Sequence, residues 1–332
     1  MFREIRDTVL LARLKLNQFK EPKNVYQGPI IDAMAQTDSQ ISLEYIKDIL
    51  DSNNITHMAL FGRQQNPNDS TQHVIDIAEA LGDKIILGSV KRFDQQDDLT
   101  PQFVKETVDS ILKGPCHYVG EIMFAHADKY PSEVGNEVTL RGERYVNAIA
   151  PNVLSLMDQL DGKDIPVFVH WEIYHWDRDW PVISELFASY PDIKFIWPHA
   201  GYGKAVYANE VLNKHKNVYV TLSKRDLFHL KRKWRTFKGE DLGGYSMANV
   251  EWQDFLGSSM LEPSGEIYHQ WLHLIQRYPD KFMFATDCHK VPRWKSYSKI
   301  ISLWREILGQ LPDDLAEMIA YKNAMFVFGI KK

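Results

Sequence analysis

Short apolar runs alternate with amphipathic segments along most of the chain, which is the pattern of strands followed by helices. The clearest unit spans residues 165–201, where the runs Val167-Phe168-Val169 and Phe195-Ile196-Trp197 each end in a histidine, His170 and His199. Apolar residues between 182 and 187 recur at helical spacing, which predicts a helix over about 180–189. Each histidine then lies at the C-terminal tip of a strand, where parallel α/β sheets and barrels gather their chemistry.

The same alternation predicts eight strands, each separated from the next by a mainly helical segment. The strands are expected at about 30–36, 56–61, 84–90, 117–124, 167–169, 195–197, 217–222 and 281–287, and the helices at about 43–52, 73–81, 101–112, 154–160, 180–189, 300–308 and 315–326, with a leading amphipathic helix over 2–16. This order is typical of a (β/α)8 TIM barrel. The alternative, a doubly wound open sheet, usually has a glycine-rich phosphate turn after its first strand, and residues 28–38 contain none. We expect one barrel domain over residues 1–332.

A long segment after the seventh strand, residues 223–266, departs from this regular spacing. It carries seven Lys or Arg residues between Lys224 and Lys238. An insertion at this point would lie on the active face as a lid or rim, and a basic rim would attract an anionic substrate. A solvated basic loop without a role is the alternative.

The composition is that of an ordinary soluble globular protein. Hydrophobic residues make up 44% and charged residues 25%, and the net charge of −5 gives no reason to expect a nucleic-acid partner. The two cysteines, Cys116 and Cys288, cannot build a disulfide framework. No apolar run approaches the ~18 residues of a membrane span. We therefore expect a cytoplasmic protein with no membrane partner.

Residues of metal-site type recur at the predicted strand ends. Glu121 lies on the fourth strand, His170 and His199 end the fifth and sixth, and Asp287 ends the eighth. One carboxylate and two imidazoles suit Zn²⁺ or another divalent transition metal with an open coordination position. Such an ion lowers the pKa of bound water and polarises a carbonyl, so Asp287 is expected to move the proton to the leaving group.

These residues lie in motifs that resemble the amidohydrolase superfamily, in particular its amidohydrolase-2 branch of metal-dependent barrel hydrolases and decarboxylases. The motifs follow the strand order: IDAMAQ, VGE, VFVHWE, WPHAG and FATDCH, with YKNAMFVFGI as the last helix. The resemblance implies that Glu121, His170 and His199 bind one metal ion, with Zn expected first and Fe or Mn as alternatives. It also implies that Asp287 is the acid/base and that the protein can be a homodimer.

The first strand departs from the family pattern. Relatives usually have His-x-His there, whereas this chain has Met34-Ala35-Gln36. Neither a thioether nor an amide replaces imidazole well on a hard or borderline divalent ion. A two-metal centre would therefore lose two ligands, and we expect a mononuclear one.

Basic and aromatic side chains near the strand ends are candidates for substrate binding. Arg225 is the preferred clamp for a carboxylate or phosphate because its planar guanidinium can bind in two places. Lys224 lies beside it, and Trp171 and Tyr202 could stack on a flat substrate at the pocket mouth. Weaker candidates are Glu172, His126 and Asp128 for the pocket, and Asp32 as a buried structural carboxylate.

Three functions remain open at this point. The first is metal-dependent hydrolysis of a small, anionic amide, ester, thioester or lactone. The second is decarboxylation, since the same branch contains decarboxylases. The third is a metal-free barrel that acts as a lactonase through Asp287 or only binds a small molecule.

Overall fold

The computed structural model describes residues 24–64, 71–92, 99–126, 131–134, 137–140, 144–173, 175–230, 233–236, 259–262 and 264–331. The predicted leading helix lies outside these residues, as does most of the insertion after the seventh strand. Among the described residues, no helix has the length and apolar character that a membrane crossing requires.

Eight parallel strands form the centre of the molecule, and all eight predicted strands are confirmed. They are β1 (Ile30–Thr37), β2 (Ile55–Gln64), β3 (Ile85–Arg92), β4 (Val119–His126), β8 (Val167–Trp171), β9 (Phe195–Trp197), β10 (Val218–Thr221) and β13 (Phe282–Met283). Parallel pairing gives the orders β1-β2-β3 and β13-β10-β9-β8-β4.

Backbone hydrogen bonds join these two sheets at both ends. Between β3 and β4, the Ser89 amide donates to the Tyr118 carbonyl at 3.0 Å. Between β1 and the segment that follows β13, the Asp287 amide donates to the Met34 carbonyl at 2.9 Å, and the Gln36 amide donates to the Cys288 carbonyl at 2.7 Å. The strands therefore run in a closed ring, which is the predicted TIM barrel.

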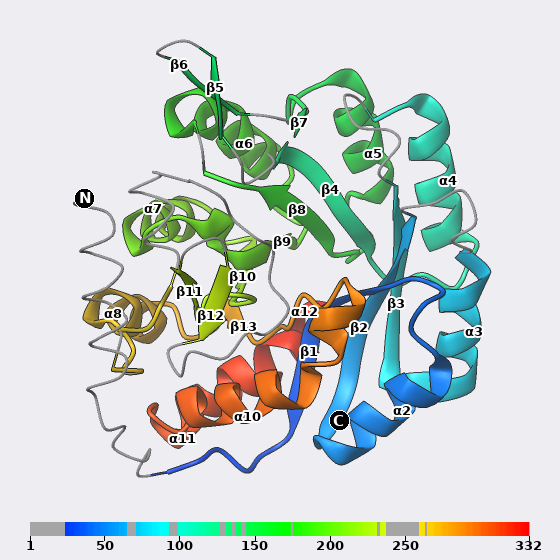
Figure 1. Cartoon of the computed structure of the whole chain (residues 1–332). Coiled ribbons are helices and arrows are strands. Elements are labelled where there is room, and N and C mark those ends of the chain that lie inside the picture. Colours follow the sequence, from blue (N-terminus) through cyan, green and yellow to red (C-terminus); the bar gives the residue numbers. More distant parts are fainter. Residues whose placement is uncertain are drawn as a thin grey trace.

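Helices cover the outside of the ring (Figure 1). They are α2 (Leu43–Ser52), α3 (Thr71–Leu81), α4 (Pro101–Leu112), α5 (Pro151–Leu160), α6 (Trp176–Ser189), α7 (Ala205–Lys214), α8 (His269–Arg277), α9 (Val291–Trp294), α10 (Tyr297–Leu308), α11 (Asp313–Glu317) and α12 (Asn323–Phe328). Local signals set several boundaries: the Thr100 hydroxyl accepts from the Phe103 amide, and Pro101 occupies the first turn of α4. Sequence reasoning did not delimit α7 and α8.

Short antiparallel elements lie outside the barrel. They are the hairpins β5 (Pro131–Val134) with β6 (Glu137–Leu140) and β11 (Leu227–Leu230) with β12 (Lys233–Thr236), and β7 (Arg144–Tyr145), which pairs with the end of β4. The β11–β12 hairpin belongs to the insertion after the seventh strand, so that segment is not a plain loop.

The interior of the barrel is apolar at one end. Phe61, Tyr118 and Phe168 contact one another there, with the Tyr118 and Phe168 ring centroids 5.3 Å apart. Phe328 of α12 packs against Tyr118 at 5.4 Å. Because successive strand residues face opposite sides, Phe168 and His170 both face the interior while Val169 faces the helices. The polar residues therefore lie at the other end of the barrel interior.

Candidate metal centre

The structure brings the three predicted metal ligands together from adjacent strands. Glu121, His170 and His199 are all buried, and one potential ligand atom from each lies within 4.8 Å of the others. Glu121 is the third residue of β4, His170 lies near the end of β8 and His199 just after β9, and these three strands are neighbours in the barrel. The arrangement provides two nitrogen donors and one carboxylate for an ion.

A left-handed turn presents His199 to the cluster. His199, Ala200, Gly201 and Tyr202 have φ of 58°, 44°, 58° and 58°, a conformation that costs free energy for residues with a Cβ atom. The Thr221 hydroxyl accepts from the His199 amide at 3.2 Å. A Cβ at Gly201 would lie 2.5 Å from the Trp171 carbonyl oxygen, so only glycine fits there. The strained backbone is therefore fixed by its surroundings.

The His199 imidazole has the properties of a metal ligand. It is fully buried, and within the part of the chain that the structure describes neither ring nitrogen has a hydrogen-bond partner. Burial, and next the neighbouring His170, lowers the pKa of His199 well below its usual value, so the ring is neutral and keeps a lone pair. Tyr202 stacks on the ring with the centroids 4.0 Å apart. A buried imidazole without partners is costly, and a cation in the cluster would satisfy it.

His170 lies between two carboxylates. Its Nδ1 is 2.5 Å from Glu121 Oε1, and its Nε2 is 3.2 Å from Glu172 Oε1. Burial alone lowers the pKa of His170, but the charge of Glu121 and hydrogen bonds to both carboxylates outweigh burial and raise it. A carboxylate on the second ring nitrogen is the usual way in which a protein orients a metal-binding histidine.

Glu172 and His126 extend this cluster. His126 Nδ1 is 3.2 Å from Glu172 Oε1, and together with His170 these residues form a second group whose ligand atoms lie within 4.8 Å. Glu172 lies directly after β8 and two residues beyond His170, on the side that the even-numbered residues of this strand face. The two-residue spacing from His170 is thus a sequence signal that favours Glu172, a weaker candidate in the sequence analysis.

Asp287 lies beside this cluster and is held by two donors. Gln36 Nε2 donates to Asp287 Oδ1 at 2.9 Å, and Lys224 forms an ion pair with Oδ2. Asp287 and Lys224 both have positive φ, 47° and 58°, although neither is glycine. Strain of this kind concentrates at functional sites. The predicted acid/base and one predicted substrate contact are thus neighbours.

Asp32 is a buried structural carboxylate, as the sequence analysis suggests. Its carboxylate accepts from the Thr286 amide at 2.9 Å, from the Thr286 hydroxyl at 2.7 Å and from the Tyr297 hydroxyl at 3.0 Å. Burial raises its pKa to about 6. Asp32 therefore anchors the segment that carries Asp287.

Two predicted substrate contacts lie in the protein interior. Trp171 is fully buried and faces the helices, because it is one residue from His170 on the strand; it stacks on Trp176, Trp180 and Trp197. Arg225 is also fully buried; its guanidinium donates to the carbonyls of His199, at 3.3 Å, and Gly203, at 2.8 Å. Because both side chains are fully buried, the structure does not favour either as a substrate contact.

Sequence reasoning gave no role to three residues near Asp287. Gln36 was noted only as a departure from the family pattern, yet its Nε2 also donates to Glu121 Oε2 at 3.3 Å. His289 Nδ1 donates to the Asp287 carbonyl at 2.8 Å, and Arg63 Nη1 donates to the His289 carbonyl at 2.9 Å. The position of Arg63 just after the second predicted strand was the available signal.

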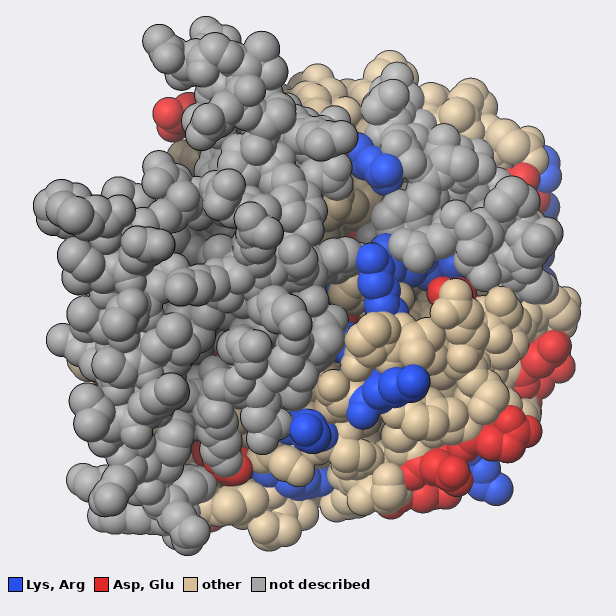
Figure 2. All heavy atoms as spheres, viewed as in Figure 1, with Lys and Arg blue, Asp and Glu red and all other residues tan. Residues whose placement is uncertain are grey.

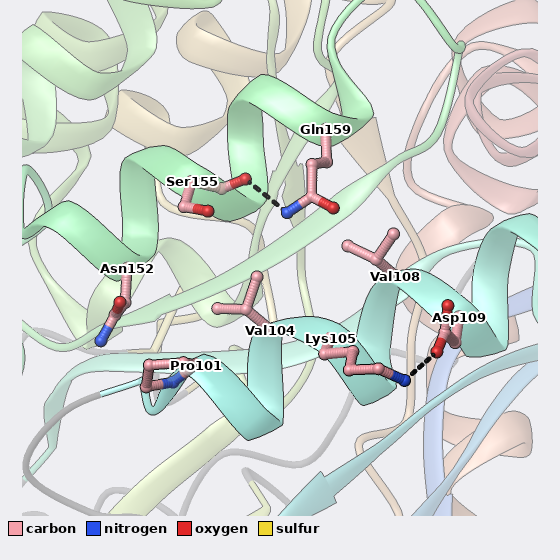
Figure 3. Close-up of a pocket in the computed structure, with 8 residues that line it drawn as sticks. All are labelled: Pro101, Val104, Lys105, Val108, Asp109, Asn152, Ser155 and Gln159. Carbon is pink, nitrogen blue, oxygen red and sulfur yellow. Dashed lines mark hydrogen bonds and ion pairs between the residues drawn. The ribbon is translucent and has the colours of Figure 1, made fainter.

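A separate pocket lies on the outer layer, between α4 and α5 (Figure 3). Val104 and Val108 line it, and the Lys105–Asp109 ion pair lies at its edge. None of the metal-site residues takes part in it, so it is distinct from the strand-tip site.

Comparisons with known proteins agree with this architecture. The amidohydrolase family model matches residues 136–330, more than half of the chain. No curated protein matches the sequence. The fold is similar to that of a candidate 2-pyrone-4,6-dicarboxylic acid hydrolase from Pseudomonas putida, with TM-score 0.57, 11% identity, and coverage of 92% of this chain and 98% of that one.

Two further solved structures are similar. An uncharacterised TIM-barrel protein from Bordetella bronchiseptica gives TM-score 0.52 and 14% identity, covering 98% of this chain and 91% of that one. A 2,6-dihydroxybenzoate decarboxylase from Rhizobium gives TM-score 0.50 and 10% identity, covering 92% and 99%. At these identities the likeness concerns the fold. With the family match over residues 136–330, it shows that this chain belongs to the amidohydrolase family, in its amidohydrolase-2 branch.

Proposed function

We propose that this protein is a hydrolase that binds one divalent metal ion through Glu121, His170 and His199 and acts on a small anionic carbonyl compound. Zn²⁺ is the first choice for two imidazoles and one carboxylate, with Fe²⁺ and Mn²⁺ as alternatives. The observation that carries the proposal is the fully buried His199, whose ring nitrogens have no hydrogen-bond partner among the described residues while two other potential ligands lie within reach.

The residues around the site then have separate tasks. A divalent ion held there would supply Lewis acidity toward a substrate carbonyl and toward water. Glu172 orients His170 through its Nε2, and Gln36 orients Asp287 through Oδ1. Asp287 is the group that accepts a proton from water and delivers it to the leaving group.

Lys224 supports an anionic substrate. Its ammonium group is paired with Asp287 Oδ2. A substrate carboxylate that forms an ion pair with Lys224 in place of Asp287 would free Asp287 Oδ2 for proton transfer. Figure 2 shows several Lys and Arg side chains on the face drawn there, separated by uncharged residues. The expected substrates are a small amide, ester, thioester or lactone with an acidic group.

A metal-free lactonase is the second candidate. Both ring nitrogens of His170 already meet carboxylates, so this part of the cluster is balanced by protein groups alone. Asp287, Lys224 and Gln36 would then carry the chemistry. Decarboxylation by the same residues is the remaining possibility within the branch.

Metal analysis tests the proposal directly. Protein purified without added metal should contain close to one equivalent of Zn, Fe or Mn, or should take it up on reconstitution. His199→Ala should lose the metal, whereas His273→Ala, a substitution of an exposed histidine on α8, should keep it. Asp287→Asn should keep the metal and lose turnover. Activity that persists without metal would support the lactonase instead, and release of CO₂ would identify a decarboxylase.

A further inference from the structure

One amide group connects two carboxylates of the site. Gln36 is 4% exposed at the tip of β1, and its Nε2 donates to Asp287 Oδ1 at 2.9 Å and to Glu121 Oε2 at 3.3 Å. Glu121 is a proposed metal ligand and Asp287 the proposed acid/base. The two groups that must act together are therefore held by a single nitrogen atom.

The orientation of this amide is fixed by chemistry. Ionised carboxylates only accept hydrogen bonds, so the reversed amide would place Gln36 Oε1 against two acceptor oxygens. The main chain is fixed as well, because the Gln36 amide donates to the Cys288 carbonyl at 2.7 Å and the Gln36 carbonyl accepts from the Trp294 indole at 3.0 Å. Gln36 Oε1 is left buried with no hydrogen-bond partner among the residues that the structure describes. The Gln36 side chain therefore donates hydrogen bonds to both carboxylates, while its own oxygen accepts none from the described residues.

Two buried carboxylates close together would ordinarily attract a cation. Here, the positive groups between and beside them come from the protein: the Nε2 hydrogens of Gln36 touch both carboxylates, and the Lys224 ammonium is paired with Asp287 Oδ2. Removing both donors would take the Lys224 ammonium away from Asp287 and leave His170 as the basic group that contacts Glu121, so the two buried carboxylates would face each other with less opposing charge, which is costly in a buried site.

We propose that Gln36 is a positioning residue that fixes the Glu121 and Asp287 carboxylates relative to each other. Its amide hydrogens and the Lys224 ammonium together occupy the position that a second metal ion would otherwise take. The centre is thereby limited to one metal ion. This inference rests on the proposed function, because it assumes that Glu121 binds the first ion.

The test uses Mn²⁺ alone as the probe, with equilibrium dialysis for stoichiometry and electron paramagnetic resonance for the environment of the ion. Wild type should bind one equivalent with the signal of an isolated ion. The double variant Gln36→Glu/Lys224→Met offers three carboxylates and lacks the Lys224 ammonium, and it should bind two equivalents with a spin-coupled signal. Gln36→Met, of similar length but without a donor, should bind one equivalent about 10- to 100-fold more weakly, because Glu121 loses its support.

The outcomes separate this inference from the proposed function. Wild type that binds no Mn²⁺ or other divalent ion would refute the metal-dependent function itself. Wild type with two equivalents, or a double variant that stays at one, would overturn only the role of Gln36. If circular dichroism shows that the double variant does not fold, Gln36→Glu alone replaces it; a second, weaker equivalent is expected there, and its absence would overturn the inference.

Discussion

The Thr286 hydroxyl donates to Asp32 Oδ2 at 2.7 Å, across 254 positions of sequence, and joins β1 to the segment that carries Asp287. The same carboxylate accepts from the Thr286 amide, so two bonds fix this segment relative to the first strand. The placement of Asp287, the proposed acid/base, therefore depends on the hydrogen bonds of Asp32.

Thr286→Val removes the hydroxyl and keeps the shape of the side chain. Hydrogen bonds to a buried charged group contribute more than neutral ones, so we expect unfolding free energy to fall by about 2 kcal/mol. Thr56→Val is the matched control: its hydroxyl donates to the neutral Ile30 carbonyl at 3.2 Å, and its loss should cost about 1 kcal/mol or less. Urea unfolding at pH 7.5 measures both. Equal losses would refute the anchoring role of Asp32.

Gly201→Ala should disturb the turn that presents His199. The new methyl group would meet the Trp171 carbonyl at 2.5 Å and Trp197 at 2.8 Å, in addition to the cost of φ +58°. We expect a loss of more than about 3 kcal/mol and at least tenfold weaker metal binding. Gly162→Ala measures the cost of the left-handed backbone alone, because Gly162 has φ +69° and open space around it. The free energy of unfolding should fall there by about 1 kcal/mol, with metal binding unchanged. Similar effects of the two variants would contradict the proposed clash.

Arg225→Lys tests whether this guanidinium supports the fold or binds substrate. Its two donors bond to the His199 and Gly203 carbonyls, and its Cζ lies 4.3 Å from the Trp271 ring centroid. Lysine cannot make both bonds, so unfolding free energy should fall by about 2 kcal/mol and metal binding should weaken. The exposed Arg277, which bonds to Asn209, gives the control Arg277→Lys with little change. Unchanged stability with a raised KM would restore Arg225 as a substrate clamp.

His215 should make stability fall in acid. It is 4% exposed, lies 2.9 Å from the Ser184 hydroxyl, and burial lowers its pKa to about 4. The unfolded chain takes up this proton near pH 6.5, so its contribution is present above that pH and is lost as the pH falls toward 4. The loss is about 1.4 kcal/mol per pH unit below 6. Between pH 7 and 5, wild type should lose about 2 kcal/mol more than His215→Gln, as measured by urea unfolding. Parallel pH profiles would refute this.

The periodicity of the sequence predicts the barrel, and the strand order predicts that the candidate metal ligands lie close together, whereas their role as ligands stays a prediction. Glu121, His170 and His199 come together because their strands are neighbours in the ring. Trp171 was misjudged because proximity to His170 along the chain was given more weight than the alternation of faces, which directs its ring toward α6.

Other features depend on contacts that no local pattern contains. The bridge from Gln36 to Glu121 and Asp287 spans 85 and 251 positions, so it exists only once the ring closes. Arg225 lies at a strand end, as expected for a binding residue, but its donors are used by the backbone of a turn whose left-handed conformation the sequence did not reveal.

The closure between β1 and the segment after β13 has a consequence for biosynthesis. The hydrogen bonds that complete the ring, from Asp287 to Met34 and from Gln36 to Cys288, come from the same residues that complete the site. A growing chain can therefore not assemble the proposed site until residues 287 and 288 have left the ribosome and docked against the first strand. If the proposed function holds, a polypeptide that ends before these residues should be inactive even where its other strands have folded.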